Sequence, residues 1–472
     1  MKQAFNPYLP SWEFVPDGEP HVFEGRVYIY GSHDFYNGDV FCMGDYVCWS
    51  ADVNDLANWR YEGVIFGRTD DPGNPDGVGC LYAPDVTQGP DGKYYMYYVV
   101  SNLCTISVAV CDTPAGKYQF VGYVKDKDGN LIGARPQDEP QFDPGVLTEG
   151  DKTYLYTGFC GRGDKSRHGA MGMVLDKDMI TVIEEPVFVV PGCEYSEGTG
   201  FEGFEYFEAA SIRKKGDMYI FVYSSIQMHE LCYAYSKNPL SGFKYGGVLV
   251  SNTDLGIDTY KPADVPAAYG ANNHGSIVEI NGEWYVFYHR HTNGTWFSRQ
   301  GCAEKLTVRE DGLFEQAEIT SCGLNGGPLE GKGYYPSYIA CHMYTDKQAV
   351  YVGDSDLPEF VNGSFPKIIK DGWDGDQNEG FVSNLRDNYT CGFKYFDLSE
   401  VKGITLTIRG YAYGSMEIST SFQGPVVKTI PLHYSNIWTD IEADLELPEG
   451  ANALYFTYRG AGSASFKGFT LK

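Results

Sequence analysis

The chain has 472 residues, more than one domain usually holds, and a formal net charge of −27. A field of that sign repels phosphate backbones and anionic lipid surfaces, so neither nucleic acid nor a membrane is an expected partner. The N-terminal residues contain no apolar segment typical of a secretory signal, and no apolar run approaches the ~20 residues that span a bilayer. Twelve single cysteines without a C-x-x-C pair indicate reduced thiols, which predicts a cytoplasmic protein.

Five segments repeat one pattern, in which a turn glycine is followed by an alternating aromatic strand. In chain order they are Gly25-RVYIYGS, Gly92-KYYMYYVVS, Gly150-DKTYLYTG, Gly216-DMYIFVYSS and Gly282-EWYVFYHR. Another short strand precedes each glycine, so each segment is expected to form a hairpin. The glycines recur at intervals of about 65 residues, which is typical of multi-stranded propeller blades. The sequence therefore predicts a five-bladed β-propeller over residues 1–322, with a plain β-sandwich as the alternative.

An ionisable residue stands seven or eight positions before each of these glycines. The five residues are Asp17, Asp85, Asp143, Glu208 and His274. Because the innermost strand of every propeller blade lines the central channel, these side chains are expected to meet near the axis. Gathering like charges there is costly unless they are paired, protonated or bound to a metal, so a purely structural role explains the pattern poorly. Carboxylates in such a ring can hydrolyse an acetal as an acid/base pair, or can bind Ca²⁺ together with the histidine.

With these motifs the sequence resembles glycoside hydrolase family 43, a family of five-bladed propellers that act on arabinose- and xylose-containing glycans. The resemblance covers residues 5–320 and implies three catalytic carboxyl groups. In PDGEPHVFEGRVYIYGS it makes Asp17 the general base, with Glu19 as a rival because the family usually has Asp-Pro there. In FDPGVL it makes Asp143 the residue that adjusts the pKa of the acid. In FEAASIRKKGDMYIFVYSS it makes Glu208 the general acid.

Other residues are expected to bind the substrate or an ion. The resemblance implies that His274, in NNHGSIVEI, helps to hold a channel ion, commonly Ca²⁺, and that Arg299, in FSRQGCAEKL, reaches the terminal sugar. Arg290 is a weaker candidate for the same contact, and Asp85, in YAPDV, is expected to be a substrate-side or structural acid. Position alone suggests a pocket rim formed by the two residues that follow the first aromatic strand. These two residues are His33 and Asp34.

The repeat ends before a Gly-rich connector that begins at Gly323, and residues 335–472 follow a different pattern. Short alternating stretches such as GITLTIRGYAY, SMEISTSF and NALYFTYRG predict a β-sandwich of the jelly-roll type. Its length and the closing GSASFKGFTLK resemble carbohydrate-binding modules of family 6. Several of its aromatic side chains are candidates either for stacking on a sugar or for the domain core. They are Trp373, Tyr389, Phe393, Tyr395 and Trp438.

The predicted protein is thus all-β, a five-bladed propeller followed by a sandwich, and its expected partner is an oligosaccharide. The resemblance implies an exo-acting, inverting glycosidase that releases terminal α-L-arabinofuranosyl residues from arabinoxylan- or xylan-derived oligosaccharides. A β-D-xylosidase as the main activity stays open, as does the oligomeric state. Two other classes compete: a sugar-binding propeller, which needs no carboxylates in register, and a phosphorylase, which needs a basic cluster for phosphate.

Overall fold

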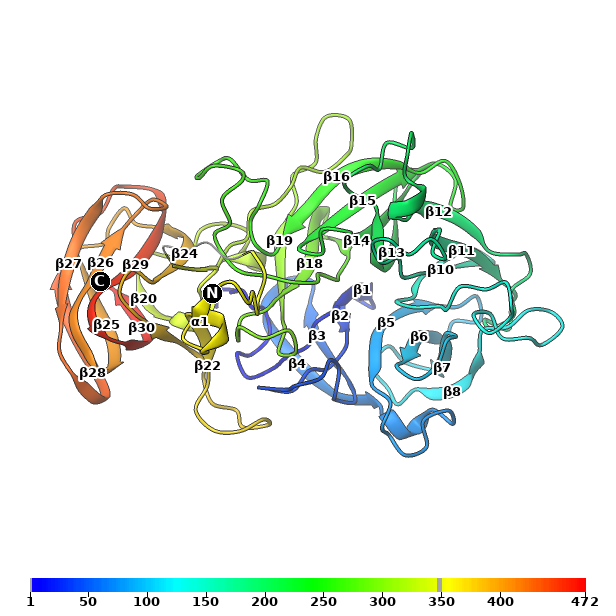
Figure 1. Cartoon of the computed structure of the whole chain (residues 1–472), viewed down its shortest axis with the longest axis horizontal. Helices are drawn as coiled ribbons and strands as arrows, with labels where there is room; N and C mark the ends of the chain where they lie inside the picture. The colour runs from blue at the N-terminus through cyan, green and yellow to red at the C-terminus, as the bar shows by residue number, and fades with distance from the viewer. Residues whose placement is uncertain (1, 346–349) are drawn as a thin grey trace.

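The computed structural model describes residues 2–345 and 350–472. It confirms the predicted all-β class, with five sheets set around one axis and a two-sheet sandwich at the side of that ring (Figure 1). In the described residues the one α-helix, α1, is the short turn Pro358–Val361. Short 3-10 helices span Arg68–Asp70, Cys193–Tyr195, Gly323–Asn325 and Ser337–Ile339. None of the helices described here is long and apolar enough to cross a lipid bilayer.

Each propeller blade is an antiparallel meander, with four strands in the first four blades and three described strands in the fifth. Blade one consists of β1 (Glu19–Phe23), β2 (Arg26–Tyr30), β3 (Tyr46–Asp52) and β4 (Asp55–Phe66). Blade two consists of β5 (Leu81–Gln88), β6 (Tyr94–Val100), β7 (Ser107–Cys111) and β8 (Gln119–Tyr123). Blade three consists of β9 (Gly145–Glu149), β10 (Lys152–Thr157), β11 (Gly169–Leu175) and β12 (Val187–Pro191). Blade four consists of β13 (Tyr206–Lys215), β14 (Met218–Ser225), β15 (Glu230–Ser236) and β16 (Lys244–Ser251). Blade five consists of β17 (Ile277–Ile280), β18 (Glu283–Arg290) and β19 (Gln300–Lys305).

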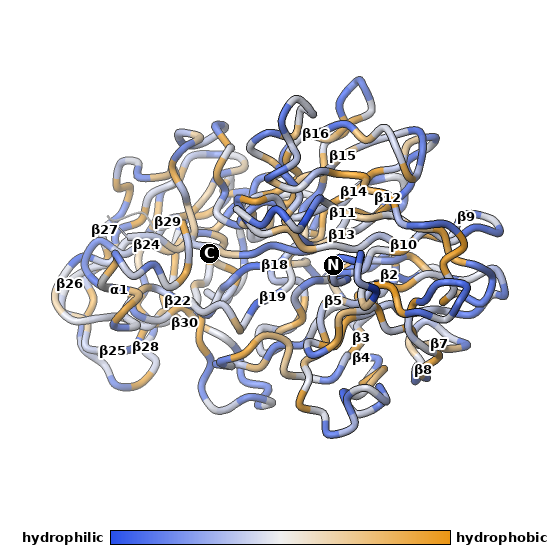
Figure 2. The backbone as a smooth tube through the Cα atoms, turned by 45° about the vertical axis from the view of Figure 1, so that its right-hand side comes forward, coloured by the Kyte–Doolittle hydropathy of each residue, from blue (hydrophilic) through white to orange (hydrophobic). Residues whose placement is uncertain are grey.

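The aromatic strands of the repeat are the second strands of the blades, and both of their faces are buried. In β2, Tyr28 and Tyr30 pack against blade two, whereas Val27 and Ile29 pack against blade five. Successive side chains of a strand point to opposite faces, so one aromatic strand supplies the core on both sides of its blade. Figure 2 shows the hydrophobic stretches along strands and the hydrophilic ones in the outer loops. This double burial explains why the second strand of each blade has little alternation between apolar and polar residues.

The repeat glycines lie in the hairpin turns between the first and second strands. All five have φ between 61° and 84°, a region that glycine reaches without the strain imposed by a Cβ atom. The N-terminal segment then closes the ring. The Asn6 side chain exchanges two hydrogen bonds with the backbone of Ala303, and the Tyr8 amide donates to the Gly301 carbonyl. Both contacts are with β19, so the two ends of the propeller sequence are joined at blade five.

The C-terminal domain has two sheets around one core. One sheet has the order β22-β23-β30-β25-β28, with β20 paired to β30, and the other has the order β21-β24-β29-β26-β27. Its first strands are β20 (Gly333–Pro336), β21 (His342–Tyr344), β22 (Lys367–Ile369), β23 (Phe381–Leu385) and β24 (Thr390–Asp397). The others are β25 (Gly403–Gly410), β26 (Ala412–Ser419), β27 (Val426–Leu432), β28 (Ser435–Asp444), β29 (Ala451–Gly462) and β30 (Ala464–Leu471). Phe393, Phe456, Phe466 and Phe469 from both sheets meet in the centre of the sandwich.

The sandwich is attached to the propeller through a buried ionic contact. The Lys394 ammonium lies 3.2 Å from Asp254 Oδ2 and 3.0 Å from Glu318 Oε2, and 3.7 Å from the centre of the Tyr260 ring. Both carboxylates come from the propeller side, whereas Lys394 is on β24. Removing one member of such a buried group would leave another charge uncompensated, so the contact holds the two domains in one arrangement.

Candidate functional site

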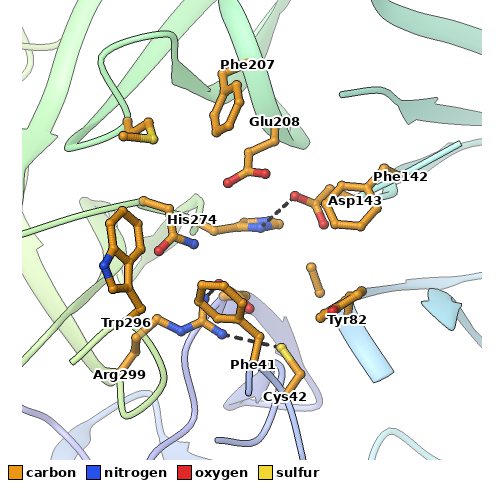
Figure 3. A pocket seen from close by; sticks show the side chains of 14 residues that line it. Phe41, Cys42, Tyr82, Phe142, Asp143, Phe207, Glu208, His274, Trp296 and Arg299 are labelled. Atoms are coloured by element: carbon orange, nitrogen blue, oxygen red, sulfur yellow. Dashed lines mark hydrogen bonds and ion pairs between the residues drawn. The ribbon is translucent and has the colours of Figure 1, made fainter. Parts of the chain in front are cut away.

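A pocket of about 360 Å³ lies where the inner strands of the blades begin. It brings together five of the residues predicted from the sequence, namely Asp17, Asp143, Glu208, His274 and Arg299. The last four of these are labelled in Figure 3. Aromatic side chains form much of the remaining wall. They are Phe41, Tyr82, Phe142, Phe207 and Trp296. A mostly apolar wall with a few convergent polar groups is typical of a site for a small ligand.

The backbone bends at the same level in three of the blades. Asp17 and Asp143 each stand two residues before their inner strand and have φ of 57° and 43°. In β13 the pairing register shifts on both sides of Glu208, and Ala209 has φ of 66°. A left-handed conformation costs a residue with a Cβ atom about 1 kcal/mol or more, so its recurrence marks a local demand of the site. The bends turn the three carboxyl groups from the strand path into the pocket.

Asp17 is held as an anion by an arginine. Arg299 Nη1 donates to Asp17 Oδ1 at 2.8 Å, and the guanidinium is itself oriented by Asp34, which accepts from Nε at 2.8 Å and from Nη2 at 3.1 Å. Burial alone would raise the pKa of the Asp17 carboxyl, but Arg299 and then His289 outweigh burial and hold that pKa well below its usual range. Asp17 is therefore ionised throughout the neutral and mildly acidic range.

Glu208 has the opposite electrostatic environment. Burial, followed by the negative charge of Asp143, raises the pKa of Glu208 to about 8. Burial also raises the pKa of Asp143, against the opposing effect of His274, whose Nδ1 lies 3.5 Å from Asp143 Oδ2. The Ala209 amide donates to the same Oδ2 atom at 3.0 Å, which fixes the Asp143 carboxyl beside Glu208. At neutral pH the pocket thus offers one carboxylate at Asp17 and one carboxylic acid at Glu208.

This pair meets the needs of acid/base hydrolysis. An ionised carboxyl can take a proton from water, while a protonated one can donate to a departing oxygen. Two carboxyl groups whose surroundings move their pKa values apart usually act as the acid and the base of such a reaction. The geometry also separates Asp17 from its rival Glu19. Glu19 is not among the described residues that line the pocket, because its Oε2 accepts from Arg213 and from Ser211 in the channel.

Asp85 lies deeper in the channel than the sequence offset predicts. It is fully buried, with Oδ1 2.6 Å from His21 Nε2 and Oδ2 accepting from the Val146 amide at 2.8 Å. The reason is the length of one turn. The segment between β5 and β6 spans 89–93, whereas the other blades have two residues between these strands. Counting back seven residues from Gly92 therefore reaches a position nearer the turn than in the other blades. Of the two roles expected for Asp85, a substrate-side or a structural acid, these contacts favour the structural one.

Three other predicted pocket residues have structural contacts instead. Arg290, His33 and Asp34 are not among the described residues that line the pocket. Arg290 donates to the Ala340 and Cys341 carbonyls, at 3.1 and 2.7 Å, and so binds β18 to the segment between β20 and β21 of the sandwich. His33 contacts Glu13 at 3.0 Å and the Asp45 carbonyl oxygen at 3.0 Å. Asp34 lies behind Arg299 rather than at the rim. The contacts of Arg290 and His33 give partners to polar groups that are buried or partly buried.

Sequence reasoning missed His289 as part of the site. The Asp17 amide donates to His289 Nδ1 at 3.3 Å, and His289 Nε2 donates to the Asn272 carbonyl at 2.8 Å. His289 thereby connects the backbone at Asp17 with Asn272, which lines the pocket next to His274. It stands seven residues after Gly282, and the same position in the other repeats carries no histidine or charged residue, so the repeat gave no signal for it. The aromatic wall residues Phe41 and Trp296 were missed for the same reason, since both come from loops.

The expected channel ion does not fit the residues present. Among the described residues, Glu19, His21 and Asp85 form a group whose ligand atoms all lie within 4.8 Å of one another. The Arg213 guanidinium already contacts this group, with Nη2 2.5 Å from Glu19 Oε2 and Nη1 3.6 Å from Asp85 Oδ2. His274 is outside the group and directs its ring nitrogens at two carboxyl groups. Because Ca²⁺ prefers about six to eight oxygen ligands, a pocket holding a fixed positive charge is a poor calcium site.

The chain is similar to known proteins along its whole length. The family model described as Glycosyl hydrolases family 43 matches residues 12–314. A xylosidase/arabinosidase of Thermoclostridium stercorarium is 63% identical over 471 residues, which are 100% of this chain and 99% of that protein. A solved β-xylosidase/α-arabinofuranosidase of family 43 from a compost microbial metagenome, in complex with xylotriose and in a calcium-free form, is 27% identical, with a TM-score of 0.51 over 66% of this chain and 96% of its own. A family 43 arabinoxylan arabinofuranohydrolase from Bacillus subtilis, in complex with cellotetraose, shares the fold over 99% of this chain and 97% of its own, with 19% identity and a TM-score of 0.54.

Proposed function

The chain belongs to glycosyl hydrolase family 43, and from this premise we propose that it is an inverting exo-glycosidase of xylan-derived oligosaccharides. It removes terminal α-L-arabinofuranosyl and β-D-xylosyl residues. The observation that carries the proposal is the pair of carboxyl groups with opposite pKa shifts in one pocket, at Asp17 and Glu208. The 63% identity to a xylosidase/arabinosidase along the whole chain supports both sugars as substrates. A sugar-binding propeller without catalysis would have no use for a protonated acid opposite an ionised base.

Each residue has a defined part in the proposed reaction. Asp17 takes a proton from the water that attacks the anomeric carbon, and Glu208 donates its proton to the glycosidic oxygen. Burial and the negative charge of Asp143 keep Glu208 protonated, and His274 orients Asp143. Arg299 keeps Asp17 ionised and presents its guanidinium to a sugar hydroxyl at the pocket surface.

The shape and charge of the pocket favour a neutral sugar at a chain end. A volume of about 360 Å³ is near the lower end of small-ligand sites, so it suits a terminal residue and its neighbour better than a polymer segment. The aromatic wall offers faces on which the apolar side of a sugar ring can pack. The net charge of −27 repels acidic glycans from a distance.

The test is a panel of aryl α-L-arabinofuranoside, aryl β-D-xyloside and xylo-oligosaccharides, with NMR of the first sugar released. We expect both aryl substrates to be cleaved, xylo-oligosaccharides to be shortened one residue at a time, and the anomeric configuration to be inverted. A retained anomer would refute the roles given to Asp17 and Glu208. Release of internal fragments, or a strict requirement for inorganic phosphate, would refute exo-hydrolysis.

The pH dependence of the reaction follows from the two shifted pKa values. Glu208 acts only when protonated, so kcat/KM should be fully present below its pKa of about 8 and decline as the pH rises through that value. Asp143→Asn removes a negative charge that raises the pKa of Glu208, so the alkaline limb should move to lower pH, in addition to a loss in rate. The measurement is the pH profile of kcat/KM on an aryl arabinofuranoside. An alkaline limb that stays in place in this variant would contradict the assignment of Asp143.

We also propose that the C-terminal sandwich binds neutral glycan chains through three exposed tyrosines. Tyr411, Tyr413 and Tyr434 are 66%, 60% and 44% exposed, although large aromatic rings are normally covered. The Tyr434 ring centre lies 4.9 Å from that of Tyr411 and 6.2 Å from that of Tyr413, whose ring is within 9° of parallel. Of the aromatic residues considered from the sequence, Tyr389 and Phe393 are in the core.

Replacing two of these rings should weaken binding to xylan without affecting the chemistry of small substrates. The double variant Tyr411→Ala/Tyr413→Ala is expected to bind xylan about 30-fold more weakly, since each stacked ring contributes on the order of 1 kcal/mol. Affinity electrophoresis in xylan measures this, and Tyr61→Ala, which removes an exposed ring of the propeller, is the matched control. Equal mobility of the double variant and the control would contradict the proposal.

A cytoplasmic location, expected from the reduced thiols, stays a prediction. All twelve cysteines are free.

A further inference from the structure

We infer that the Arg213 guanidinium takes the place of a metal ion in the propeller channel, so that hydrolysis needs no divalent cation. The inference rests on the proposed function, which supplies the substrate for the activity assay. The main measurement that tests it is cation binding rather than activity. Arg213 lies on β13, five residues beyond Glu208, and its side chain is 11% exposed. It therefore reaches from the strand of the proposed acid into the channel beneath the pocket.

The contacts of the guanidinium are those that a channel cation would make. Nη2 donates to Glu19 Oε2 at 2.5 Å and to the Pro20 carbonyl at 3.3 Å. Nη1 donates to the Ile212 carbonyl at 2.8 Å and lies 3.6 Å from Asp85 Oδ2. Four oxygen atoms from blades one, two and four thus converge on one fixed positive group. A planar guanidinium with several N–H donors can satisfy these oxygen atoms in place of a coordinated metal ion.

The channel already holds a positive group beside its carboxyl groups. Glu19 and Asp85 both contact Arg213, whose guanidinium is always charged. His274 faces the same region, with Nε2 3.6 Å from Glu19 Oε1 and Nδ1 3.5 Å from Asp143 Oδ2. A divalent ion bound to Glu19 and Asp85 would lie beside a guanidinium that repels it.

The same contacts connect Arg213 with the proposed catalytic carboxyl groups. Glu19 Oε2 accepts from Arg213 and from Ser211 Oγ, and the other oxygen, Oε1, is buried and faces His274. His274 in turn lies against Asp143. Arg213 is therefore a positioning residue, which holds Glu19 and through it the histidine that orients Asp143.

His21 completes the arrangement. Its Nε2 lies 2.6 Å from Asp85 Oδ1 and 3.1 Å from Arg213 Nη2, so the ring stands between the acid and the guanidinium. If the arginine were absent, Glu19, His21 and Asp85 would be left as a compact set of two carboxylates and an imidazole, which is a donor set suited to a divalent cation.

The experiment compares the wild-type protein with Arg213→Met, which keeps the length and loses the charge, and with Arg213→Lys, which keeps the charge. Each protein is dialysed against EDTA and titrated with calcium chloride, by calorimetry and by thermal unfolding. We expect Arg213→Met to bind one more Ca²⁺ per chain than the wild type and to gain several degrees in Tm with the ion. The wild type and Arg213→Lys should show only the weak response that an acidic surface gives, which is common to all three proteins.

The wild-type protein alone decides the matter if Arg213→Met does not fold. Its kcat/KM on an aryl glycoside should change by less than about twofold between EDTA and millimolar calcium chloride. A wild-type enzyme that loses activity in EDTA and recovers it with Ca²⁺ would overturn the inference, as would a folded Arg213→Met that binds no additional ion. If no aryl glycoside is cleaved under any condition, the proposed function fails, whereas the calorimetric comparison still tests the channel.

Discussion

Glu208→Gln is expected to lower kcat/KM on xylo-oligosaccharides by about 10³-fold, because the amide cannot donate the proton that the departing sugar oxygen needs. The loss should depend on the leaving group. An aryl glycoside with an acidic phenol leaves without protonation, so its rate should decline much less than that of an oligosaccharide. Steady-state kinetics on a series of aryl glycosides with phenols of different pKa measures this dependence.

The matched control for this variant is Glu279→Gln, an exposed glutamate on β17 with the same change of side chain. It should keep wild-type kinetics on every substrate. Similar thermal unfolding of both variants would show that the loss at Glu208 is chemical. A Glu208→Gln enzyme within tenfold of the wild type on oligosaccharides, or a loss that is equal for all leaving groups, would rule out Glu208 as the acid.

Asp17→Asn is expected to lower kcat by a similar factor, about 10³-fold, with a different dependence on the leaving group. The base acts on water, so good and poor leaving groups should lose rate alike. The asparagine oxygen can still accept from Arg299, and Asp34 continues to hold that guanidinium, so the pocket should keep its shape. Kinetics on the same aryl series, together with the Tm of the variant, tests both statements.

Glu19→Gln is the control that separates the two candidate bases. Glu19 faces Arg213 in the channel, so its replacement should lower stability more than it lowers the rate of the folded enzyme. A Glu19→Gln enzyme that loses as much activity as Asp17→Asn, with the same indifference to the leaving group, would transfer the role of base to Glu19.

The candidate site was predictable wherever the hairpin between the first and second strands has the same length. Asp17, Asp143, Glu208 and His274 keep a nearly constant distance from their glycines because two residues form each of those turns. Asp85 departs from the pattern because its turn is longer. The number of residues between a repeat glycine and an ionisable residue gives the position along the strand only when the turn between them has a constant length. The longer turn before β6 is therefore the one local cause of the wrong position predicted for Asp85.

The residues around these carboxyl groups were less predictable. Arg290 and Arg299 lie near one another in sequence, yet Arg290 binds the sandwich and Arg299 binds Asp17. Nothing in the repeat distinguishes them, because their partners come from segments far away in the chain. The same holds for Arg213, which the sequence shows only as part of a strand that ends in two lysines.

The sequence by itself determined the blades and the level at which each inner strand carries its ionisable residue. Alternating aromatic side chains bury both faces of the second strands, and glycine permits the turn that precedes them, so these are local consequences of residue type. The tertiary structure alone decided which charges meet. Asp17 contacts Arg299, and Glu19 contacts Arg213, across the closed ring. The first contact holds the pKa of Asp17 low, whereas burial and the neighbouring Asp143 raise that of Glu208. The second contact fills the channel with a guanidinium. Electrostatic interactions depend on distance in space and not on distance along the chain, so the sequence alone could not give these pairings.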